Sequence, residues 1–401
     1  MGVLYNLSIR FYAFFIWLVH TKHPKAKAWI NGRKNYWINL PEIPQNEQIY
    51  WFHCASLGEF DQGIPVMNLI KANNPSIRIL VTFFSPSGME HYHNRKHVAD
   101  YVFYLPIDTP QNAKRFLDHF NPKQIFFIKY EFWLNYIFEA KKRNIPLYSI
   151  SCILRPSHIF FKWYGGYFRK GLRAFDHFYV QNKETSLLLL NIGITKISIT
   201  GDTRFDKVLE NKMLVQIDDK IECFLQGSKA IILGSSWPTE ENLFHKYFTE
   251  NNIQNKVIIA PHDISENHLS FIENLFHDQT IRYSKFQDDS GKKILLIDCI
   301  GKLANAYTYG KYAFIGGGFT GKLHNTLEPV VFGLPVLFGP KHTRFPEAQQ
   351  FIDSGIGFSI TTKEEFARAT LFIEQNLSDL HVKCEQEIKK SKGASERISL
   401  R

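Results

Sequence analysis

Two series of short apolar segments, separated by helix-like stretches, constrain this 401-residue chain more than any other feature. The first series is 48–55, 78–84, 101–107, 124–130, 146–152, 177–182 and 197–201, and the second is 229–236, 256–262, 293–298, 312–318 and 335–340. Each segment is rich in β-branched or aromatic residues and almost continuously apolar, which is typical of parallel strands covered on both faces. We therefore predict an α/β fold of two doubly wound domains, joined near residue 206.

The N-terminal segment is expected to contact a membrane. Residues 4–20 are largely apolar, and residues 21–34 behind them are basic. The longest uninterrupted apolar part, 11–19, is shorter than the roughly 20 residues of a bilayer span. A short-spanning or interfacial membrane anchor with its basic flank on anionic headgroups is one interpretation, and a buried first helix of the fold is the other.

The charge and cysteine content restrict the partners. A formal net charge of +10 suits an anionic partner, which could be nucleic acid, an acidic membrane surface or a phosphorylated substrate. The five cysteines are scattered and form no CxxC, which argues for a reducing compartment and against a zinc site. His91, His93 and His97 do not share one helix face, so no metal is expected there. The basic, aromatic segment 161–173 fits a lipid surface, although stacking on nucleic-acid bases would also explain it.

Two acids and a base follow predicted strands of the first domain. Glu59, in HCASLGEFDQG, lies where the chain turns from strand to helix, and a helix N-terminus favours a carboxylate there. Ser56 and Gly58 keep this loop open, as a general base that reaches a bound hydroxyl requires. Glu131, in KYEFWLN, follows another strand, so the two acids could flank one cleft into which Arg204 of GDTRFD points. Helix capping and surface ion pairs are the alternative roles.

Helix starts of the second domain could hold a phosphate. The segments 235–242 and 260–268 each follow a strand, and His262 could add a donor to the backbone N–H groups. Residues 316–321 formally match G-x-G-x-x-G, but no helix follows at once, which disfavours a dinucleotide fingerprint.

A glycine turn that lets a nucleotide approach the backbone is the preferred interpretation of 316–321. The following HNTLE would open a helix capped by Asn325, with Glu328 one turn in. Glu328 could then accept hydrogen bonds from a ribose diol, or it could form a plain capping box with Asn325.

These motifs together resemble those of the 3-deoxy-D-manno-octulosonic acid (Kdo) transferases of Gram-negative lipopolysaccharide synthesis. HCASLGE resembles H-x-A-S-x-G-E, KYEFWLN resembles T-E-x-W-P-N, and GDTRFD resembles G-N-x-K-F-D. GGGFTGKLHNTLEP, followed by GLPVLFGP and F-P-E, resembles G-G-S…G-G-H-N-x-L-E. The resemblance implies an inverting glycosyltransferase of the GT-B class, with two Rossmann-like domains facing a central cleft. It divides the chain into a membrane-anchor helix (1–20), an acceptor-binding domain (21–205) and a donor-binding domain (206–401).

The resemblance also implies substrates and roles. CMP-Kdo would be the donor and a lipid A precursor the acceptor, at the cytoplasmic face of the inner membrane, with no cofactor, metal or nucleic acid. Glu59 falls on the general base, Glu131 and Arg204 fall on positions of transition-state support, and Ser56 and Gly58 lie on the acceptor side. The CMP-binding positions are Pro261, His262, Ile300, Gly301, Lys302, Asn325, Thr326, Leu327 and Glu328.

Several residues depart from the family pattern. His262-Asp263 stands where the family often has Arg-His, Lys302 where it often has Glu, and Arg204 replaces a Lys. The glycines before the histidine are replaced, giving Lys322-Leu323-His324. A transferase of UDP-sugars remains an alternative, which competition by CMP and UDP separates. A nucleic-acid binder would show salt-sensitive binding but leaves the HNTLE and GE motifs unexplained, and a nicotinamide dehydrogenase is the weakest alternative.

Overall fold

The computed structural model describes residues 2–287 and 291–399, and the chain divides into two compact units. The first unit comprises residues 1–207 and 391–401, and the second comprises residues 208–390. The division falls inside α9 (Arg204–Met213), close to the boundary that we expected near residue 206. The expected second domain, 206–401, differs from the structure at its end, because the C-terminal segment returns to the first unit.

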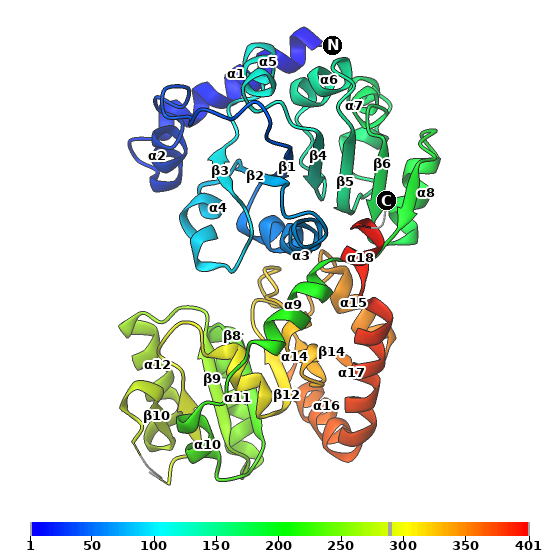
Figure 1. The fold of residues 1–401 in the computed structure, drawn as a ribbon. Helices are drawn as coiled ribbons and strands as arrows, with labels where there is room; N and C mark the ends of the chain where they lie inside the picture. Colours follow the sequence, from blue (N-terminus) through cyan, green and yellow to red (C-terminus); the bar gives the residue numbers. More distant parts are fainter. Residues whose placement is uncertain (1, 288–290, 400–401) are drawn as a thin grey trace. The chain divides into compact units, whose positions relative to one another are not determined.

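The first unit is a doubly wound parallel sheet of seven strands in the order β3-β2-β1-β4-β5-β6-β7 (Figure 1). The strands are β1 (Ile49–Cys54), β2 (Arg78–Phe83), β3 (Tyr101–Tyr104), β4 (Gln124–Ile128), β5 (Leu147–Cys152), β6 (His177–Val180) and β7 (Ile197–Ile199). Its helices include α3 (Leu57–Asn73), α4 (Pro86–His91), α5 (Pro110–Phe120), α6 (Leu134–Lys142), α7 (Gly166–Leu172) and α8 (Lys183–Leu190). Every strand that the sequence predicted for this domain is present.

Both faces of this sheet are packed, which explains why its strands are apolar throughout. Trp51 and Phe127 belong to one buried cluster, whereas the neighbours Phe52 and Phe126 belong to a second. Because successive strand side chains point to opposite faces, the two clusters lie on opposite sides of the sheet.

The second unit repeats the doubly wound pattern in the order β10-β11-β9-β8-β12-β13-β14. Its strands are β8 (Ala230–Ser236), β9 (Val257–Pro261), β10 (Thr280–Arg282), β11 (Ile294–Leu296), β12 (Gly310–Ile315), β13 (Val336–Phe338) and β14 (Gly357–Ser359). Its helices are α10 (Asp219–Leu225), α11 (Pro238–Glu250), α12 (Glu266–Phe276), α13 (Leu303–Thr308), α14 (Leu327–Val331), α15 (Pro346–Asp353), α16 (Lys363–Gln375) and α17 (Leu377–Ser391). The sequence did not predict β10 and β14, which have three residues each.

The N-terminal apolar segment forms α1 (Gly2–Val19), which is followed by α2 (Pro24–Asn31). Among the described residues, α1 is the helix that is long and apolar enough to cross a membrane. Only Ile9 of this helix is buried, and most of its large apolar side chains are exposed. This exposure disfavours the alternative of a buried core helix.

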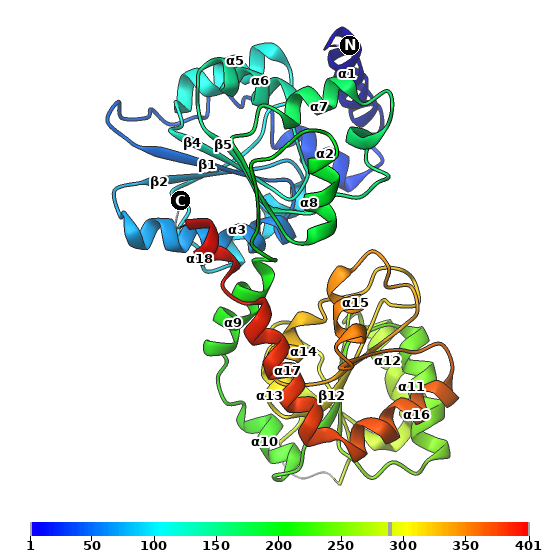
Figure 2. The ribbon, with the colours of Figure 1, turned by 90° about the vertical axis from the view of Figure 1, so that its right-hand side faces the viewer.

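The C-terminal helix α18 (Ala394–Ser399) is bound to the first unit beside α3 (Figures 1 and 2). The carboxylate of Asp206 accepts hydrogen bonds from the backbone N–H groups of Gly393 (2.6 Å) and Ser395 (2.8 Å). Arg397 Nε donates to the carbonyl oxygen of Thr200 at 3.0 Å. Ile398 joins the buried cluster that α3 covers, so residues 393–398 complete the first unit.

Replacing Asp206 by Ala is expected to release this C-terminal segment. The change removes the acceptor of three hydrogen bonds, two from backbone N–H groups and one from the Ser395 hydroxyl. We expect limited proteolysis after residue 390 to accelerate and the first unit to lose about 2 kcal/mol of stability. Asp219→Ala, a change at an exposed aspartate, is the control, and equal proteolysis of both variants would contradict the assignment.

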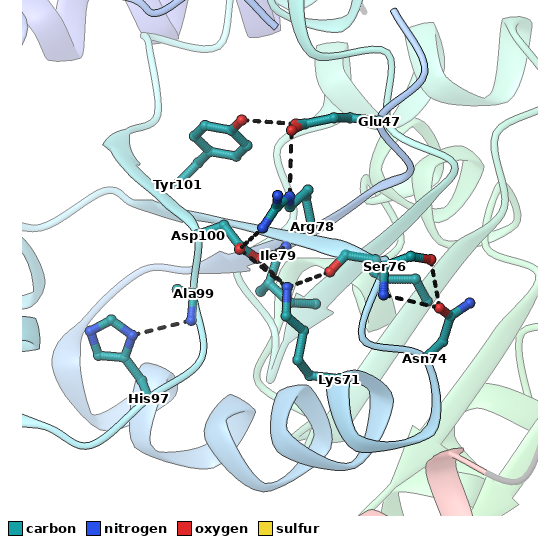
Figure 3. A network of polar contacts seen from close by, with 11 residues as sticks. Glu47, Lys71, Asn74, Ser76, Arg78, Ile79, His97, Ala99, Asp100 and Tyr101 are labelled. Atoms are coloured by element: carbon teal, nitrogen blue, oxygen red, sulfur yellow. Dashed lines mark hydrogen bonds and ion pairs between the residues drawn. The ribbon is translucent and has the colours of Figure 1, made fainter. Parts of the chain in front are cut away.

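A charged network ties the strand starts of the first unit together (Figure 3). Lys71, near the end of α3, lies 2.8 Å from Asp100, which also accepts from Arg78 Nη1 at 2.8 Å. Arg78 additionally pairs with Glu47, whose carboxylate accepts from the Tyr101 hydroxyl. Since Arg78 begins β2 and Asp100 precedes β3, the network holds the amino-terminal edge of the sheet. The opposite, carboxyl edge carries the candidate site.

Candidate functional site

The candidate site of the first unit lies where the strand order reverses, between β1 and β4. The chain runs outward from β1 through β2 to β3, then returns to β4 on the other side. In doubly wound sheets, ligands bind beyond the carboxyl ends of the strands at this switch point. Glu59 follows β1 in the first turn of α3, and Glu131 follows β4. The two strands are neighbours in the sheet, so the structure brings the two predicted acids to one place.

Glu59 is buried and bonded to the loop that precedes its helix. Its Oε2 accepts hydrogen bonds from the backbone N–H groups of Ala55 and, at 3.2 Å, Ser56. Because both of these capping bonds are accepted by Oε2, Glu59 can cap the helix and still use Oε1 for a functional role. Within the described residues, Oε1 has no hydrogen-bond partner. Burial raises the pKa of Glu59 to about 7, against the lowering effect of Lys129, and the charge of Glu131 raises it further.

Glu131 lies in a loop that begins with a strained residue. Lys129, directly after β4, has a φ of +61°, a conformation that non-glycine residues rarely adopt. Such strain is found preferentially at functional sites, where the surrounding structure holds it. Glu131 itself is half-buried, and burial raises the pKa of its carboxyl group. The result is a lysine and two perturbed carboxyl groups at one sheet edge.

Arg204 is oriented by an acid two residues before it. Its Nε and Nη2 lie 2.8 Å and 2.7 Å from Oδ2 of Asp202, which is almost fully buried. Gln62 Nε2 donates to the other oxygen of Asp202 at 3.2 Å. Because Gln62 and Glu59 are three residues apart on α3, this pair lies beside the turn that holds Glu59.

The loop in front of Glu59 is open, as the sequence predicted. Gly58 is exposed, and a Cβ added there would meet no atom within 4 Å. Ser56 is half-buried and is the N-cap residue of α3.

The sequence did not assign a role to His53, which connects β1 to the Glu131 loop. His53 is fully buried, and its Nε2 lies 2.9 Å from Nε1 of Trp133. An indole N–H only donates, so His53 is neutral with its proton on Nδ1, which lies 2.9 Å from Thr82 Oγ1. Burial lowers the pKa of His53 to about 3, in agreement with this neutral form. A lone histidine inside an otherwise apolar strand was the available signal.

The second unit presents an aromatic cluster at the corresponding switch point, between β8 and β12. Trp237 follows β8, His262 follows β9, and His324 follows the glycine turn after β12. The rings of Trp237 and His262 stack with centroids 4.6 Å apart, and those of His262 and His324 lie 4.4 Å apart. Trp237 Nε1 donates to His324 Nε2 at 3.1 Å, and burial lowers the pKa of His324 to about 4. Of these three, only His262 was a predicted site residue.

The predicted helix after the glycine turn is short and begins one residue later than expected. The N-cap residue of α14 is Thr326, whereas Asn325 accepts from the N–H of Leu327 at 3.0 Å. Asn325 Nδ2 donates to Oε1 of Glu328 at 3.1 Å. Asn325 is therefore not the N-cap residue that we expected. Its side chain instead forms an asparagine turn just before the helix, because it accepts a hydrogen bond from the N–H group two residues ahead. Glu328 lies in the first helical turn, as predicted.

The glycine turn packs against the chain itself. A Cβ on Gly316 would lie 2.0 Å from the carbonyl oxygen of Ser235, and one on Gly318 would lie 2.3 Å from the nitrogen of Gly339. The expectation that the glycines let a nucleotide approach the backbone is therefore not needed to explain them. Contact between neighbouring chain segments already excludes a side chain at these two positions.

The segment after β11 contains the other predicted donor residues. Ile300 is exposed, and Gly301 has a φ of +91°. The Lys302 ammonium lies 2.8 Å from Asp218, which also accepts from the Tyr283 hydroxyl. The hydrogen bond to Asp218 raises the pKa of Lys302, so a phosphate at this lysine would share it with a carboxylate.

Two adjacent glutamates that the sequence did not single out support this edge of the second unit. Glu240 is buried and accepts from the N–H of Gly317 at 2.8 Å. Glu241 accepts from Ser236 Oγ at 2.7 Å, and its other oxygen lies 2.9 Å from Nε2 of His268. From the first turn of α11 the pair therefore binds both the glycine turn and α12. Asp263, at the departure from the family pattern, accepts from the N–H of Ser265 before α12.

Across residues 2–287 and 291–399, no group of three or more His, Cys, Asp or Glu side chains is arranged to hold a metal ion.

Pro261 ends β9 and is buried, directly before His262. Apart from Pro261, which ends a strand, the predicted donor positions follow strands of the second unit, and Glu59, Glu131 and Arg204 follow strands of the first.

The comparisons with known sequences agree with this arrangement. The model of the 3-deoxy-D-manno-octulosonic-acid transferase (kdotransferase) domain matches residues 31–207, within the first unit. The 3-deoxy-D-manno-octulosonic acid transferase of Aquifex aeolicus (strain VF5) is 28% identical over 349 residues, covering 86% of this chain and 90% of that protein. The enzyme of the same name from Haemophilus influenzae (strain ATCC 51907 / DSM 11121 / KW20 / Rd) is 26% identical, covering 83% of this chain and 80% of that protein.

Solved structures share the two-unit fold. UDP-GlcNAc 2-epimerase from Neisseria meningitidis has a TM-score of 0.63 at 16% identity, covering 88% of this chain and 98% of that one. MurG from Acinetobacter baumannii has a TM-score of 0.53 at 11% identity, also covering 88% and 98%. These likenesses confirm the predicted GT-B fold of two doubly wound units. Residues 31–207 therefore match the Kdo transferase domain, most of the chain is similar in sequence to Kdo transferases, and the protein is a glycosyltransferase.

Proposed function

We propose that this protein transfers Kdo from CMP-Kdo to a lipid A precursor with inversion at the anomeric carbon, and that Glu59 is the general base. The observation that carries the proposal is the buried Glu59 carboxyl group at the switch point of the first unit, with a pKa raised to about 7. A general base works best when its pKa lies near the operating pH. Its free Oε1 and the exposed Gly58 in front of it suit an acceptor hydroxyl.

The proposed step is one direct displacement. Glu59 removes the proton from the acceptor hydroxyl while that oxygen forms a bond to the anomeric carbon of Kdo. The bond from this carbon to the phosphate oxygen breaks, and CMP leaves with the electron pair. Attack opposite the leaving phosphate inverts the configuration. Lys129 and Arg204 supply fixed positive charge at this sheet edge, and Glu131 orients the reacting groups.

The donor is proposed to bind the carboxyl edge of the second sheet. His262 and the first turn of α14, Asn325 to Glu328, would contact the cytidylate, with Pro261 and the segment Ile300 to Lys302 beside them. The rings of Trp237, His262 and His324 form an aromatic cluster at this edge, in which Trp237 stacks on His262 and His324 is tilted against it. Glu328 is placed for the ribose diol in this proposal, since it lies in the first turn of its helix.

A membrane location at the cytoplasmic face of the inner membrane is part of the proposal. Helix α1 exposes a run of large apolar side chains, and basic residues 21–34 follow it. Trp163 is 91% exposed, and Lys162 and Lys170 lie close to it in sequence. Exposed aromatic and basic side chains together are typical of surfaces that contact anionic lipid. No nucleic-acid partner is proposed.

Incubation of the purified protein with CMP-Kdo and a lipid A precursor tests the proposal. Mass spectrometry of the lipid is expected to show the mass increase of one or more Kdo units. CMP is expected to inhibit the reaction, and UDP is not. Inhibition by UDP alone, or transfer from a UDP-sugar instead, would establish the alternative of a different nucleotide sugar.

The pH dependence of the reaction should report the perturbed base. Glu59 must be deprotonated to accept a proton, and its pKa is raised to about 7. We therefore expect kcat/KM to fall about tenfold for each pH unit below about 7. This acid limb would lie well above the pH range in which an ordinary glutamate titrates. A measured acid limb near the ordinary glutamate pKa would contradict the role of this residue.

A further inference from the structure

One side of α1 is bonded to the segment that carries Glu131. The hydroxyl group of Tyr5 donates to Asp108 Oδ2 at 2.5 Å and accepts from the backbone N–H of Leu134 at 3.3 Å. Oδ1 of Asn6 accepts from Nδ2 of Asn135 at 2.8 Å. Leu134 and Asn135 come directly after the loop 129–133, so the helix contacts the continuation of the candidate catalytic loop.

The buried carboxylate of Asp108 links Tyr5 of α1 to the start of α6. The residue is almost fully buried, and its carboxylate accepts from the N–H groups of Asn135 (3.1 Å) and Tyr136 (3.2 Å) at the start of α6. A buried carboxylate is costly unless its oxygens are hydrogen-bonded. The Tyr5 hydroxyl supplies the remaining direct side-chain donor, so α1 helps to fix the beginning of α6.

The middle of α1 contacts the same loop through aromatic rings. The ring of Tyr12 lies 6.1 Å from that of Phe84 at an interplanar angle of 27°, and Phe84 lies 4.4 Å from Trp133. Trp133 in turn donates to the buried His53 of β1. The loop with Glu131 is therefore held from two sides, by β1 through His53 and by α1 through Tyr5, Asn6 and Tyr12.

We propose that α1 is a wall of the acceptor site, in which Tyr5, Asn6 and Tyr12 are positioning residues for the Glu131 loop, and that the helix lies along the membrane surface. This inference rests on the proposed role of the first unit as the acceptor side. The buried and partly buried positions of α1, which recur about every three to four residues, face the protein: Gly2, Tyr5, Asn6, Ile9, Ala13 and Ile16. Most of the remaining positions carry exposed apolar side chains: Val3, Leu4, Leu7, Phe11, Phe14, Phe15, Trp17, Leu18 and Val19. Ser8, Arg10 and Tyr12 are exposed as well.

The different character of the two sides of α1 indicates how the helix is oriented relative to the membrane. A helix that spans a bilayer is surrounded by lipid or by other membrane segments. Here one stripe makes polar contacts with the first unit, while the other side is mostly apolar and, within residues 2–19, includes only Ser8 and Arg10 as exposed non-aromatic polar residues. This is the pattern of a helix that lies in the interface with its apolar face toward the acyl chains. The exposed side of α1 would insert into the membrane surface, and the hydrogen-bonded side would keep the Glu131 loop in position.

Two matched double variants separate these roles. Tyr5→Phe with Asn6→Ala removes the bonds of the inner stripe and keeps the outer stripe. Phe15→Ser with Leu18→Ser changes two side chains of the outer stripe, which are 61% and 50% exposed, and keeps the bonds. Each protein is assayed with CMP-Kdo and a water-soluble acceptor that lacks acyl chains, and by sedimentation with phosphatidylglycerol vesicles. Amide hydrogen exchange of residues 129–140 gives a measurement that does not depend on activity.

The inner-stripe variant is expected to lose about tenfold in kcat with little change in KM, to exchange about tenfold faster over 129–140, and to bind vesicles normally. The outer-stripe variant is expected to lose vesicle binding and to keep both kcat and exchange. If amides 129–140 of the inner-stripe variant exchanged at the wild-type rate, the proposal would be overturned. This result does not depend on which sugar the wild-type protein transfers, so it is separate from a failure of the proposed function. Loss of kcat with the soluble acceptor in the outer-stripe variant would overturn the proposal as well.

Discussion

Glu59→Gln is expected to reduce kcat by about 10² to 10⁴-fold, the usual contribution of a general base. Glutamine keeps the size of the side chain and an oxygen that can accept the two backbone bonds from Ala55 and Ser56. It cannot take a proton from the acceptor hydroxyl. Initial rates with CMP-Kdo and a lipid A precursor at saturating concentrations measure the effect. A variant that folds normally and retains near-full turnover would remove Glu59 from the mechanism.

The same variant should be more stable than the wild type in mildly alkaline solution. The folded-state pKa of Glu59 is raised from 4.5 to about 7, so the fold favours its protonated form. Its contribution to stability is fully present below the unfolded-state pKa and is lost as the pH rises through about 7. Thermal unfolding at about pH 8 should therefore occur at a higher temperature in the variant. A lower unfolding temperature there would show that the ionised carboxylate is stabilising, contrary to its burial.

Gly316→Ala is expected to destabilise the second unit by about 3 kcal/mol or more, because overpacking against backbone cannot relax as a side chain can. The added Cβ would lie 2.0 Å from the carbonyl oxygen of Ser235 and 2.8 Å from the Cα of Ser236. To relieve this clash, β8 would have to move away from the turn that follows β12. The hydrogen bond from the N–H of Gly316 to the carbonyl oxygen of Gly234 (3.0 Å) opposes that movement. Chemical denaturation measures the loss.

Gly58→Ala is the matched control for this prediction. It is the same chemical change, but the new Cβ meets no atom within 4 Å, and the site is the second residue of a helix. Replacing a helical glycine by alanine should stabilise by up to about 1 kcal/mol. Equal destabilisation of the two variants would show that the turn at Gly316 is not closely packed. A raised KM for the acceptor in Gly58→Ala, without loss of stability, would add support to the open approach to Glu59.

The strands were predictable because their chemistry is local. Trp51 and Phe52, or Phe126 and Phe127, are consecutive apolar residues that only a sheet covered on both faces can bury. The position of Glu59 and Glu131 at strand ends could also be read along the chain. Strand order could not, since the adjacency of β1 and β4 depends on which long-range pairing buries the most surface.

Other parts of the site depend on contacts between distant segments. Trp133 and His53 are 80 residues apart in sequence, and nothing near either residue shows that they share a hydrogen bond. The return of the C-terminal helix to the first unit rests on Asp206 and Gly393, which are 187 residues apart. The close packing of Gly316 against Ser235 and of Gly318 against Gly339 is a further contact that only the folded chain reveals.

The order of motifs along the chain was sufficient to identify the fold class, the similarity to Kdo transferases and the residues at the strand ends, because residue type and short-range periodicity carry that information. The protonation state of those residues was decided by tertiary structure alone. A carboxyl group acquires a pKa near 7 only when folding removes its water and places another acid beside it. For the same reason, the apolar helix α1 was recognisable from composition, whereas its bonded stripe required the partners at Asp108, Leu134 and Asn135 to be in place.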